Sequence, residues 1–236
     1  MSRIVESQLY GRLTREAANI DDLGIPTWSL IREAIQSGER NRALELIAYL
    51  RVESRIPGFS SQVSNSLTYI ADNHGEPHVE KALRWWRTVL QQSGDTVRSL
   101  NFRELVYYQA EEIRGEFRAS KGRRAFAVTE ESDRIILSLD PCGTGGWLRR
   151  IAQRSPSHRL GVTRQAYPWS WGKTGVPYFC THCCIWWEIM EIEEMGYPLR
   201  VHEFPDDAQE PCRIIYYRKP DLIPDQYFER VGIKKG

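Results

Sequence analysis

The sequence Cys180-Thr181-His182-Cys183-Cys184 places four residues that can ligate a metal or act as nucleophiles within five positions. Cys180 and Cys183 are separated by two residues, a spacing that lets both thiolates of a tight turn face one ion. His182 and Cys184 are alternative ligands in the same turn. This segment therefore predicts a metal site, and the histidine among the thiols favours zinc over iron or an iron–sulfur cluster.

Two more cysteines, Cys142 and Cys212, lie at the edges of predicted strands on either side of this segment. If the two hairpins lie side by side, their thiolates complete a tetrahedral zinc site with Cys180 and Cys183. An open site, with His182 or water in place of one thiolate, would activate water or polarise a carbonyl. Metal-free alternatives are a thiol enzyme that uses Cys142 or Cys183 as nucleophile, and buried cysteines without chemistry.

The stretch Asp140-Pro141-Cys142-Gly143-Thr144-Gly145-Gly146 follows a predicted strand. It resembles the first motif of S-adenosylmethionine-dependent methyltransferases, in which a strand ends on an acidic residue before a glycine turn. The leading glycine of that motif is missing here, and only about 85 residues follow, too few for the remaining parallel strands. We expect the glycines to turn the backbone sharply, so that Asp140 reaches the thiols as a general acid or base, together with His182. A turn-capping aspartate is the alternative.

Aromatic residues are concentrated on both sides of the cysteine segment. They would line a pocket for a flat or apolar ligand, or form a wall of the core beneath the metal loop. We expect substrate contacts from Trp147, Trp169, Trp171 and Tyr178, whereas the adjacent Trp186 and Trp187 fit a core better. Three cations, Arg149, Arg150 and Lys173, are expected to neutralise an anionic substrate. The acidic residues that follow are expected to form mainly a solvated helix face, with Glu188 in reach of the site: Glu188, Glu191, Glu193 and Glu194.

Residues 1–120 show apolar residues at helical spacing, interrupted by glycine and proline breaks, which predicts five or six helices in a bundle-like array. Beyond residue 121 the period changes. Strands are expected at 124–128, 134–139, 199–204 and 212–217, helices at 145–153 and 183–195, and an extended tail at 220–236. The predicted fold class is α+β. It comprises a helical domain (1–120) packed on a Cys-rich domain (121–236) with a small mixed or antiparallel sheet.

With 41% hydrophobic and 27% charged residues, the composition is that of a globular protein with a real core. Lys and Arg (32) balance Asp and Glu (31), which argues against nucleic acid or an anionic membrane as partner. An apolar signal core and a membrane-span-length apolar window are both missing, so we expect a cytoplasmic protein. The helical half could serve as a lid, a scaffold or a dimerisation element, which leaves a homodimer open.

The glycine-rich stretch, the Cys-x-His-Cys segment and the closing Cys212-x-x-x-Tyr216-Tyr217-x-Lys219-Pro220 resemble a group of uncharacterised bacterial proteins. More faintly, a cysteine turn, a helix and a late cysteine that opens a terminal strand are similar to the L-2-amino-thiazoline-4-carboxylic acid hydrolase family. This resemblance spans at most residues 120–220. It implies a hydrolase acting on a small nitrogen- or sulfur-containing substrate.

These observations favour a zinc-dependent hydrolase or lyase whose small-molecule substrate lies in a tryptophan-rich pocket. A binding or regulatory module with a closed, structural four-cysteine zinc site is the first alternative. A metal-free cysteine enzyme is the second, and a methyltransferase the last.

Overall fold

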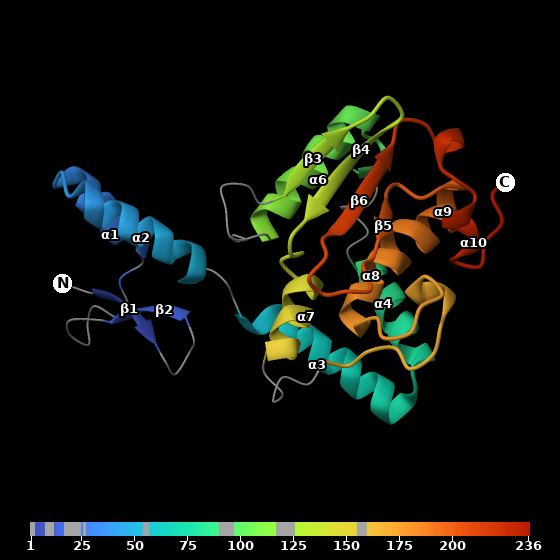
Figure 1. Ribbon diagram of the computed structural model, residues 1–236, viewed down its shortest axis with the longest axis horizontal. Helices are drawn as coiled ribbons and strands as arrows, with labels where there is room; N and C mark the ends of the chain where they lie inside the picture. The colour runs from blue at the N-terminus through green and yellow to red at the C-terminus, as the bar shows by residue number, and fades with distance from the viewer. Residues whose placement is uncertain are drawn as a thin grey trace. The chain divides into compact units, whose positions relative to one another are not determined.

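The computed structural model describes residues 3–7, 12–16, 25, 27–53, 57–89, 97–116, 126–154 and 160–236 (Figure 1). The chain forms two compact units, Met1–Pro57 and Gly58–Gly236. The fold class is α+β, as predicted. Among the described helices, none combines the length and the apolar character needed to cross a membrane.

The first unit contains two strands where only helix was expected. Strands β1 (Arg3–Ser7) and β2 (Arg12–Glu16) pair antiparallel, and helices α1 (Thr27–Gln36) and α2 (Arg40–Glu53) follow. The two helices bury a small core of Ile31, Ala34, Ala43 and Leu46. The strands were missed because five-residue strands rich in charged residues carry little apolar alternation.

The second unit is built on a four-stranded antiparallel sheet in the order β3-β4-β6-β5. Its strands are β3 (Ala127–Glu130), β4 (Arg134–Leu139), β5 (Val201–Glu203) and β6 (Cys212–Tyr217). The bounds of β4 and β6 are those predicted, while β3 and β5 are shifted or shorter. Because each described pairing is antiparallel, the sheet differs from the parallel sheet that a methyltransferase requires.

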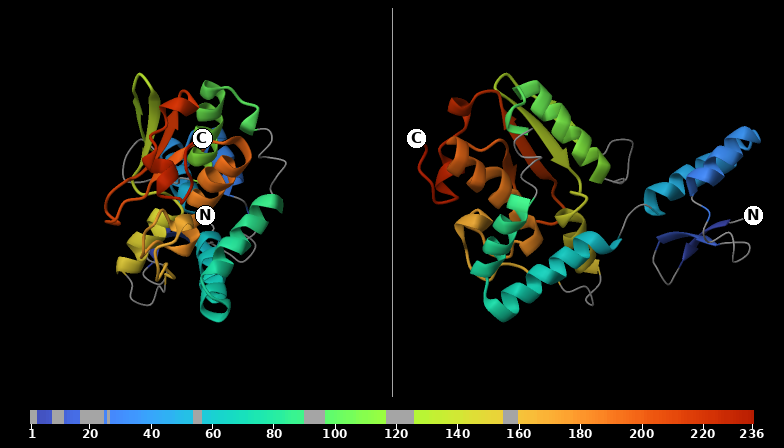
Figure 2. Two further views of the ribbon diagram at one scale, coloured as in Figure 1. Left: turned by 90° about the vertical axis from the view of Figure 1, so that its right-hand side faces the viewer. Right: turned by 180° about the vertical axis from the view of Figure 1, so that it is seen from behind.

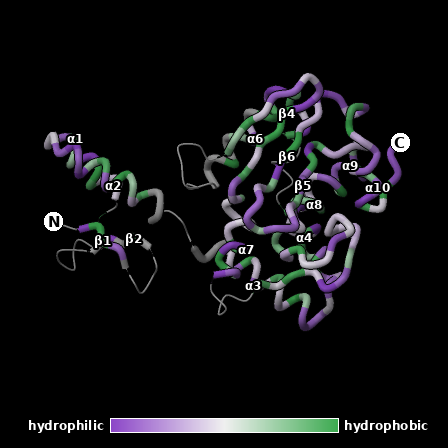
Figure 3. Tube along the Cα trace, viewed as in Figure 1, coloured by the Kyte–Doolittle hydropathy of each residue, from purple (hydrophilic) through white to green (hydrophobic). Residues whose placement is uncertain are grey.

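Helices cover both faces of this sheet (Figures 1 and 2). On one face, Leu137 and Tyr216 pack in a core with Leu105 and Val106 of α6 (Phe102–Glu116). On the other, Val201 and Ile215 join a larger core made by the remaining helices and by residues 167–179, which we call the aromatic loop. These helices are α3 (Pro57–His74), α4 (Pro77–Val89), α7 (Gly145–Arg154), α8 (Thr181–Cys184), α9 (Met190–Met195) and α10 (Gln226–Glu229). Hydropathy varies along each of these elements, as expected when one face is buried (Figure 3).

The boundary between the units lies near residue 57 and not near 120, where the sequence suggested it. The cause is that α3 and α4 bury their apolar stripes against the cysteine-bearing half. Leu67, Val79 and Leu83 share one core with Trp169 and Cys184. The helices of residues 58–116 are therefore part of the same unit as the sheet.

The chain from residue 181 to 195 forms one helical run with three parts. Between α8 and α9, residues Ile185–Ile189 adopt π-helical geometry, in which the Met190 N–H donates to the carbonyl of Ile185. The run ends at Gly196, whose φ of 82° provides a left-handed C-terminal cap. The tail is also more structured than the extended segment expected, since it forms the 3₁₀ turn Pro220–Leu222 and helix α10.

Replacing Leu83 by alanine tests the revised boundary. Leu83 is fully buried, so the substitution should cost about 2–5 kcal/mol of unfolding free energy. The loss should appear in the unfolding of the sheet itself, monitored by hydrogen exchange of the backbone amides of β4 and β6. Lys81→Ala, on the exposed face of the same helix, should change stability by less than about 0.5 kcal/mol. If Leu83→Ala destabilised the helices but left the stability of the sheet unchanged, the result would contradict a single unit that contains both α4 and the sheet.

Candidate functional site

The sheet brings Cys142 and Cys212 together. Cys212 is the first residue of β6 and pairs with Leu139, the last residue of β4. From Leu139 the chain passes through Asp140-Pro141 to Cys142, just before α7. Both cysteines therefore lie at the same end of the sheet, although 70 positions separate them in the sequence.

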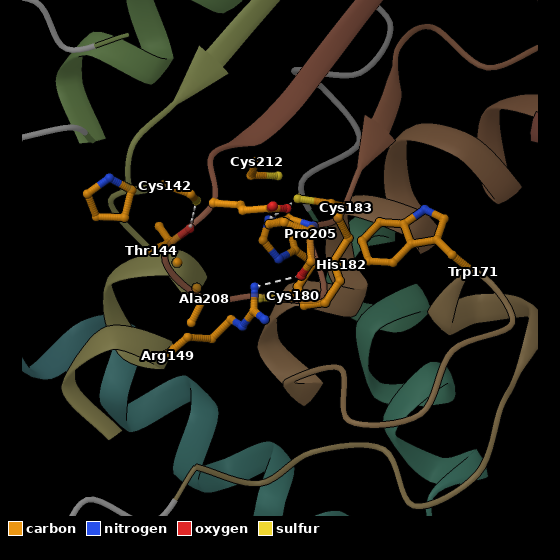
Figure 4. A pocket seen from close by; sticks show the side chains of 15 residues that line it. Cys142, Thr144, Arg149, Trp171, Cys180, His182, Cys183, Pro205, Ala208 and Cys212 are labelled. Carbon is orange, nitrogen blue, oxygen red and sulfur yellow. Dashed lines mark hydrogen bonds between the residues drawn. The ribbon is translucent and has the colours of Figure 1, made fainter. Parts of the chain in front are cut away.

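A tight helical turn supplies the other two thiols. Cys180 ends the 3₁₀ turn Tyr178–Cys180, and Cys183 lies in the first turn of α8. Residues three apart on a helix share a face. Both side chains, with those of Cys142 and Cys212, line one cavity, which we call the thiol pocket (Figure 4). The four cysteines therefore line the same cavity.

The glycines at the start of α7 allow the close packing around the thiols. A Cβ atom on Gly145 would overlap the Sγ atom of Cys180. On Gly146 it would lie 3.1 Å from the Cβ of Cys142 and 3.3 Å from the Cβ of Pro141. The glycine-rich stretch is therefore needed for the approach of the helix to the cysteines, and no cofactor is required to explain it.

All five cysteines are free thiols. Burial raises the pKa of Cys142, and raises the pKa of Cys180 and Cys212 well above the ordinary value. The neighbouring thiols of the pocket raise these pKa values further, while the positive charge of Arg149 acts in the opposite direction on Cys180 and Cys212. Near pH 7 these three side chains are consequently protonated, so a metal ion would have to displace their protons.

His182 also lines the thiol pocket. Its Nδ1 is hydrogen-bonded to the backbone carbonyl of Phe179. Because a carbonyl can only accept, Nδ1 carries the proton, and the neutral ring keeps a lone pair on Nε2. Nε2 lies 3.5 Å from the Sγ of Cys183. This is the tautomer that a histidine needs to ligate a metal or accept a proton through Nε2.

The thiol pocket is small and mainly apolar. Its volume is about 30 Å³, enough for one ion or one to two water molecules. Besides the thiols, its lining includes Trp171, Phe204, Pro205, Ala208 and Glu210. Among the described residues, no three His, Cys, Asp or Glu side chains already converge as a metal-binding group. The donor types fit zinc, and the thiols would have to turn toward a common centre to bind it.

Several expected site residues lie elsewhere. The side chain of Asp140 is 64% exposed and pairs with Arg150, outside the lining of the thiol pocket. Trp169 and Tyr178 are buried in the core, where Trp169 stacks on Tyr167 and the Tyr178 hydroxyl donates to Glu76 at 2.8 Å. Trp147 is half-buried against the same core.

Of the expected substrate-binding residues, Trp171 and Arg149 line the pocket. Arg149 is also hydrogen-bonded to backbone carbonyls of residues 205 and 206. Lys173 lies outside the lining, donating to the Phe204 carbonyl and to Asp206. Both cations thus fasten the loop that follows β5, a role different from the expected neutralisation of an anionic substrate.

Trp171 has a φ of 55°, in the left-handed region that is unfavourable for residues other than glycine. Its indole N–H donates to Glu188 at 3.0 Å, and its ring stacks on Phe204 with centroids 5.5 Å apart. These contacts offset the backbone strain and fix one wall of the thiol pocket.

Glu188 and Glu191 are fully buried, which corrects the expectation of a mainly solvated helix face. Glu188 accepts hydrogen bonds from Trp171, from the His202 backbone and ring, and from Arg230. Burial raises the pKa of Glu188, but Arg230 and His202 together outweigh it and hold the pKa below the usual value. The signal was present in the sequence, since Glu188 is in register with Ile185 and Ile192 on the apolar stripe.

Replacing Glu188 by glutamine should lower the unfolding free energy at pH 7 by about 3–5 kcal/mol, because Arg230 loses its buried countercharge. The folded-state pKa of Glu188 is depressed, so its stabilisation is complete above the unfolded value near 4.5 and is lost as pH falls through the folded value. The gap between wild type and variant, measured by urea unfolding, should therefore shrink below about pH 4.5.

Glu193→Gln is the matched control. Its side chain is 47% exposed and pairs with Arg84 on the surface, so the loss should stay below about 1 kcal/mol. If the difference in unfolding free energy between wild type and Glu188→Gln did not change between pH 7 and pH 3, the result would contradict the depressed pKa of Glu188.

Comparisons with protein-family models, with curated proteins and with solved structures found no match for this chain. The function of the protein has to be inferred from the chemistry of the thiol pocket.

Proposed function

We propose that the thiol pocket binds one zinc ion and that the protein is a zinc-dependent hydrolase or lyase acting on a small molecule. The observation that carries this proposal is the convergence of four thiols and one imidazole from three separate chain segments on one cavity. Thiolate and imidazole are the donors that zinc prefers. With three of these side chains as ligands and the fourth coordination position open, zinc would supply Lewis acidity at neutral pH.

The residues of the thiol pocket would then act as zinc ligands, as a proton acceptor and as an apolar surface for the substrate. Three side chains would hold the ion and leave one coordination position open: Cys142, Cys180 and Cys183, with Cys212 or His182 as alternative ligands. If His182 is not a ligand, its Nε2 can accept a proton, because Nδ1 is occupied by the Phe179 carbonyl. Trp171 and Phe204 would exclude water and present an apolar surface to the substrate. Asp140 has no part in this scheme, since its carboxylate pairs with Arg150 outside the pocket.

A reducing compartment is required for this chemistry. The five cysteines are free, and oxidation would remove the thiolates. We therefore place the protein in the cytoplasm, with a small molecule as its partner.

Elemental analysis of the reduced protein, purified without an affinity metal column, tests the zinc proposal. We expect about one zinc per chain, and a loss of zinc affinity of tenfold or more in Cys183→Ser, because serine is a poor ligand. Cys184→Ser is the matched control. Cys184 is fully buried outside the pocket lining, with its thiol directed to the Pro168 carbonyl, so the variant should keep its zinc. A folded wild-type protein that takes up no zinc would refute the proposal.

The coordination sphere separates an enzyme from a structural module. X-ray absorption of the zinc-loaded protein should show three sulfur ligands with a nitrogen or oxygen ligand if the site is open. Four sulfur ligands would indicate a closed site that cross-links the end of the sheet to α7 and α8. In that case the binding-module alternative replaces the enzyme.

A second candidate function has an observation of its own. The 3.5 Å distance between Cys183 Sγ and His182 Nε2 is compatible with a thiol–imidazole pair, in which the histidine removes the proton of a cysteine nucleophile. In the metal-free protein, His182→Ala should then slow the alkylation of Cys183 about tenfold or more. Alkylation unaffected by this substitution would exclude a metal-free cysteine enzyme of this type.

A further inference from the structure

The loop of residues 204–211, between β5 and β6, covers the thiol pocket; we call it the access loop. Phe204, Pro205, Ala208 and Glu210 of this loop line the pocket, and Cys212 follows directly. Any ion or molecule that reaches the thiols therefore contacts the access loop. Figure 4 shows Pro205 and Ala208 beside the cysteines.

Two arginines of α7 fasten this loop, in addition to Lys173, which donates to the Phe204 carbonyl and to Asp206. Arg149 donates from Nη1 to the Pro205 carbonyl at 2.9 Å and from Nη2 to the Asp206 carbonyl at 2.7 Å. Arg150 donates to the carbonyls of Ala208 and Gln209, both at 2.9 Å, and also pairs with Asp140. Both arginines are in α7, whose N-terminus packs on Cys142 and Cys180.

These contacts are mostly polar. The carbonyls of the access loop accept from cations that are themselves partly exposed. Each hydrogen bond of this kind makes only a modest net contribution to stability, because its donor and acceptor can bind water instead. The paired strands on either side, in contrast, share a buried core. Segments held mainly by such bonds open locally without global unfolding. The loop is thus expected to open more readily than β5 and β6.

A second cavity shares part of the lining of the thiol pocket. This outer groove has a volume of about 390 Å³. Its lining shares Arg149 and Ala208 with the thiol pocket, and adds Ala152, Gln153, Leu160, Val162, Gly175 and Pro177. Arg149 and Ala208 therefore form the partition between a groove large enough for a small molecule and a pocket large enough for an ion.

We propose that the access loop is the gate of the thiol pocket, with Arg149 and Arg150 as its latch and the outer groove as its approach. Separation of Arg149 from the loop carbonyls joins the groove to the pocket. The small-molecule substrate would place its reacting end at the thiols and the remainder in the apolar groove. That assignment of the passing ligand rests on the proposed function, while the gate itself is a property of the loop and α7.

Thiol alkylation by iodoacetamide in reduced, metal-free protein tests the gate, with peptide mass spectrometry to resolve each cysteine. Arg149→Met and Arg150→Met keep a long aliphatic side chain but remove the donors. We expect each to accelerate alkylation of Cys142 about tenfold, as local opening becomes more frequent. Cys142 is the readout because the charge of Arg149 acts to lower the pKa of Cys180 and Cys212, against the effect of burial, and its removal would itself change their reactivity. Arg154→Met is the matched control, because Arg154 is on the same helix but donates to no carbonyl of residues 204–211. It should leave all rates unchanged.

Cys184 is the internal control, since it is fully buried but does not line the pocket. If its alkylation accelerates as much as that of Cys142, the arginine variants loosen the whole unit and the gate is refuted. An unchanged rate at Cys142 in both variants would refute it as well. Because the experiment uses metal-free protein, it tests the gate even if the protein does not bind zinc.

The approach is tested separately by Ala152→Trp, which places an indole in the outer groove without removing a latch residue. With a bulky aryl maleimide as probe, this variant should lose reactivity at the pocket cysteines and keep the wild-type rate with small iodoacetamide. Undiminished maleimide labelling would show that the route does not pass through the groove.

Discussion

The arrangement around the thiol pocket depends on the hydrogen bonds that the buried carboxylate of Glu188 accepts. This carboxylate is fully buried, and accepts from the Trp171 indole, the His202 backbone and ring, and the Arg230 guanidinium. These donors come from the aromatic loop, from β5 and from the segment after α10. A single charge in the helical run 181–195 therefore positions three segments that are distant in the sequence. A buried carboxylate is tolerated only when donors replace its lost hydration, so these segments can pack only in the arrangement that supplies them.

Two further buried carboxylates act in the same way around this centre. Glu76, before α4, accepts from the hydroxyls of Tyr178 and Tyr167 and from the backbone of Arg164. Glu191 accepts from Arg87 and Arg98. The aromatic loop and the helices are thus joined by charged hydrogen bonds as well as by apolar contacts. Such networks give one defined packing rather than large stability, because the desolvation of the ions opposes the attraction between them.

The sequence predicted which cysteines lie together better than it predicted the boundary between the units. The spacing of Cys180 and Cys183 and the strand edges at Cys142 and Cys212 were sufficient to predict that the four thiols meet, because antiparallel neighbours place the end of one strand beside the start of the next. The α+β class and the bounds of β4 and β6 followed from periodicity. Asp140 could not be placed in this way. Whether its carboxylate faces the thiols or Arg150 depends on the path of the access loop, which carries no periodic signal.

The aromatic residues illustrate the same limit. From the sequence, Trp169, Trp171 and Tyr178 are equally suited to line a pocket, and all three are buried. Only Trp171 lines the thiol pocket, because the hydrogen bond to Glu188 and the left-handed backbone direct its ring there. The burial of Glu188 is itself a tertiary effect that overrides the usual preference of carboxylates for solvent. The boundary between the units near residue 57 likewise depends on which core the apolar stripes of α3 and α4 join. An apolar stripe shows which face of a helix is buried, but not which element buries it.

The π-helical segment Ile185–Ile189 amounts to one residue more than a regular α-helix would need between the thiols and Glu191. Each residue advances an α-helix by about 100°. Deletion of one residue from this segment would restore regular geometry and turn the face that bears Cys180 and Cys183 by about that angle relative to Glu191 and Ile192. The angle about the helix axis between the face with the cysteines and the face with the buried glutamates therefore depends on the number of residues in the π-helical segment. In sequences with the same cysteine spacing, conservation of this length would be a better sign of a shared site than conservation of the residues within it.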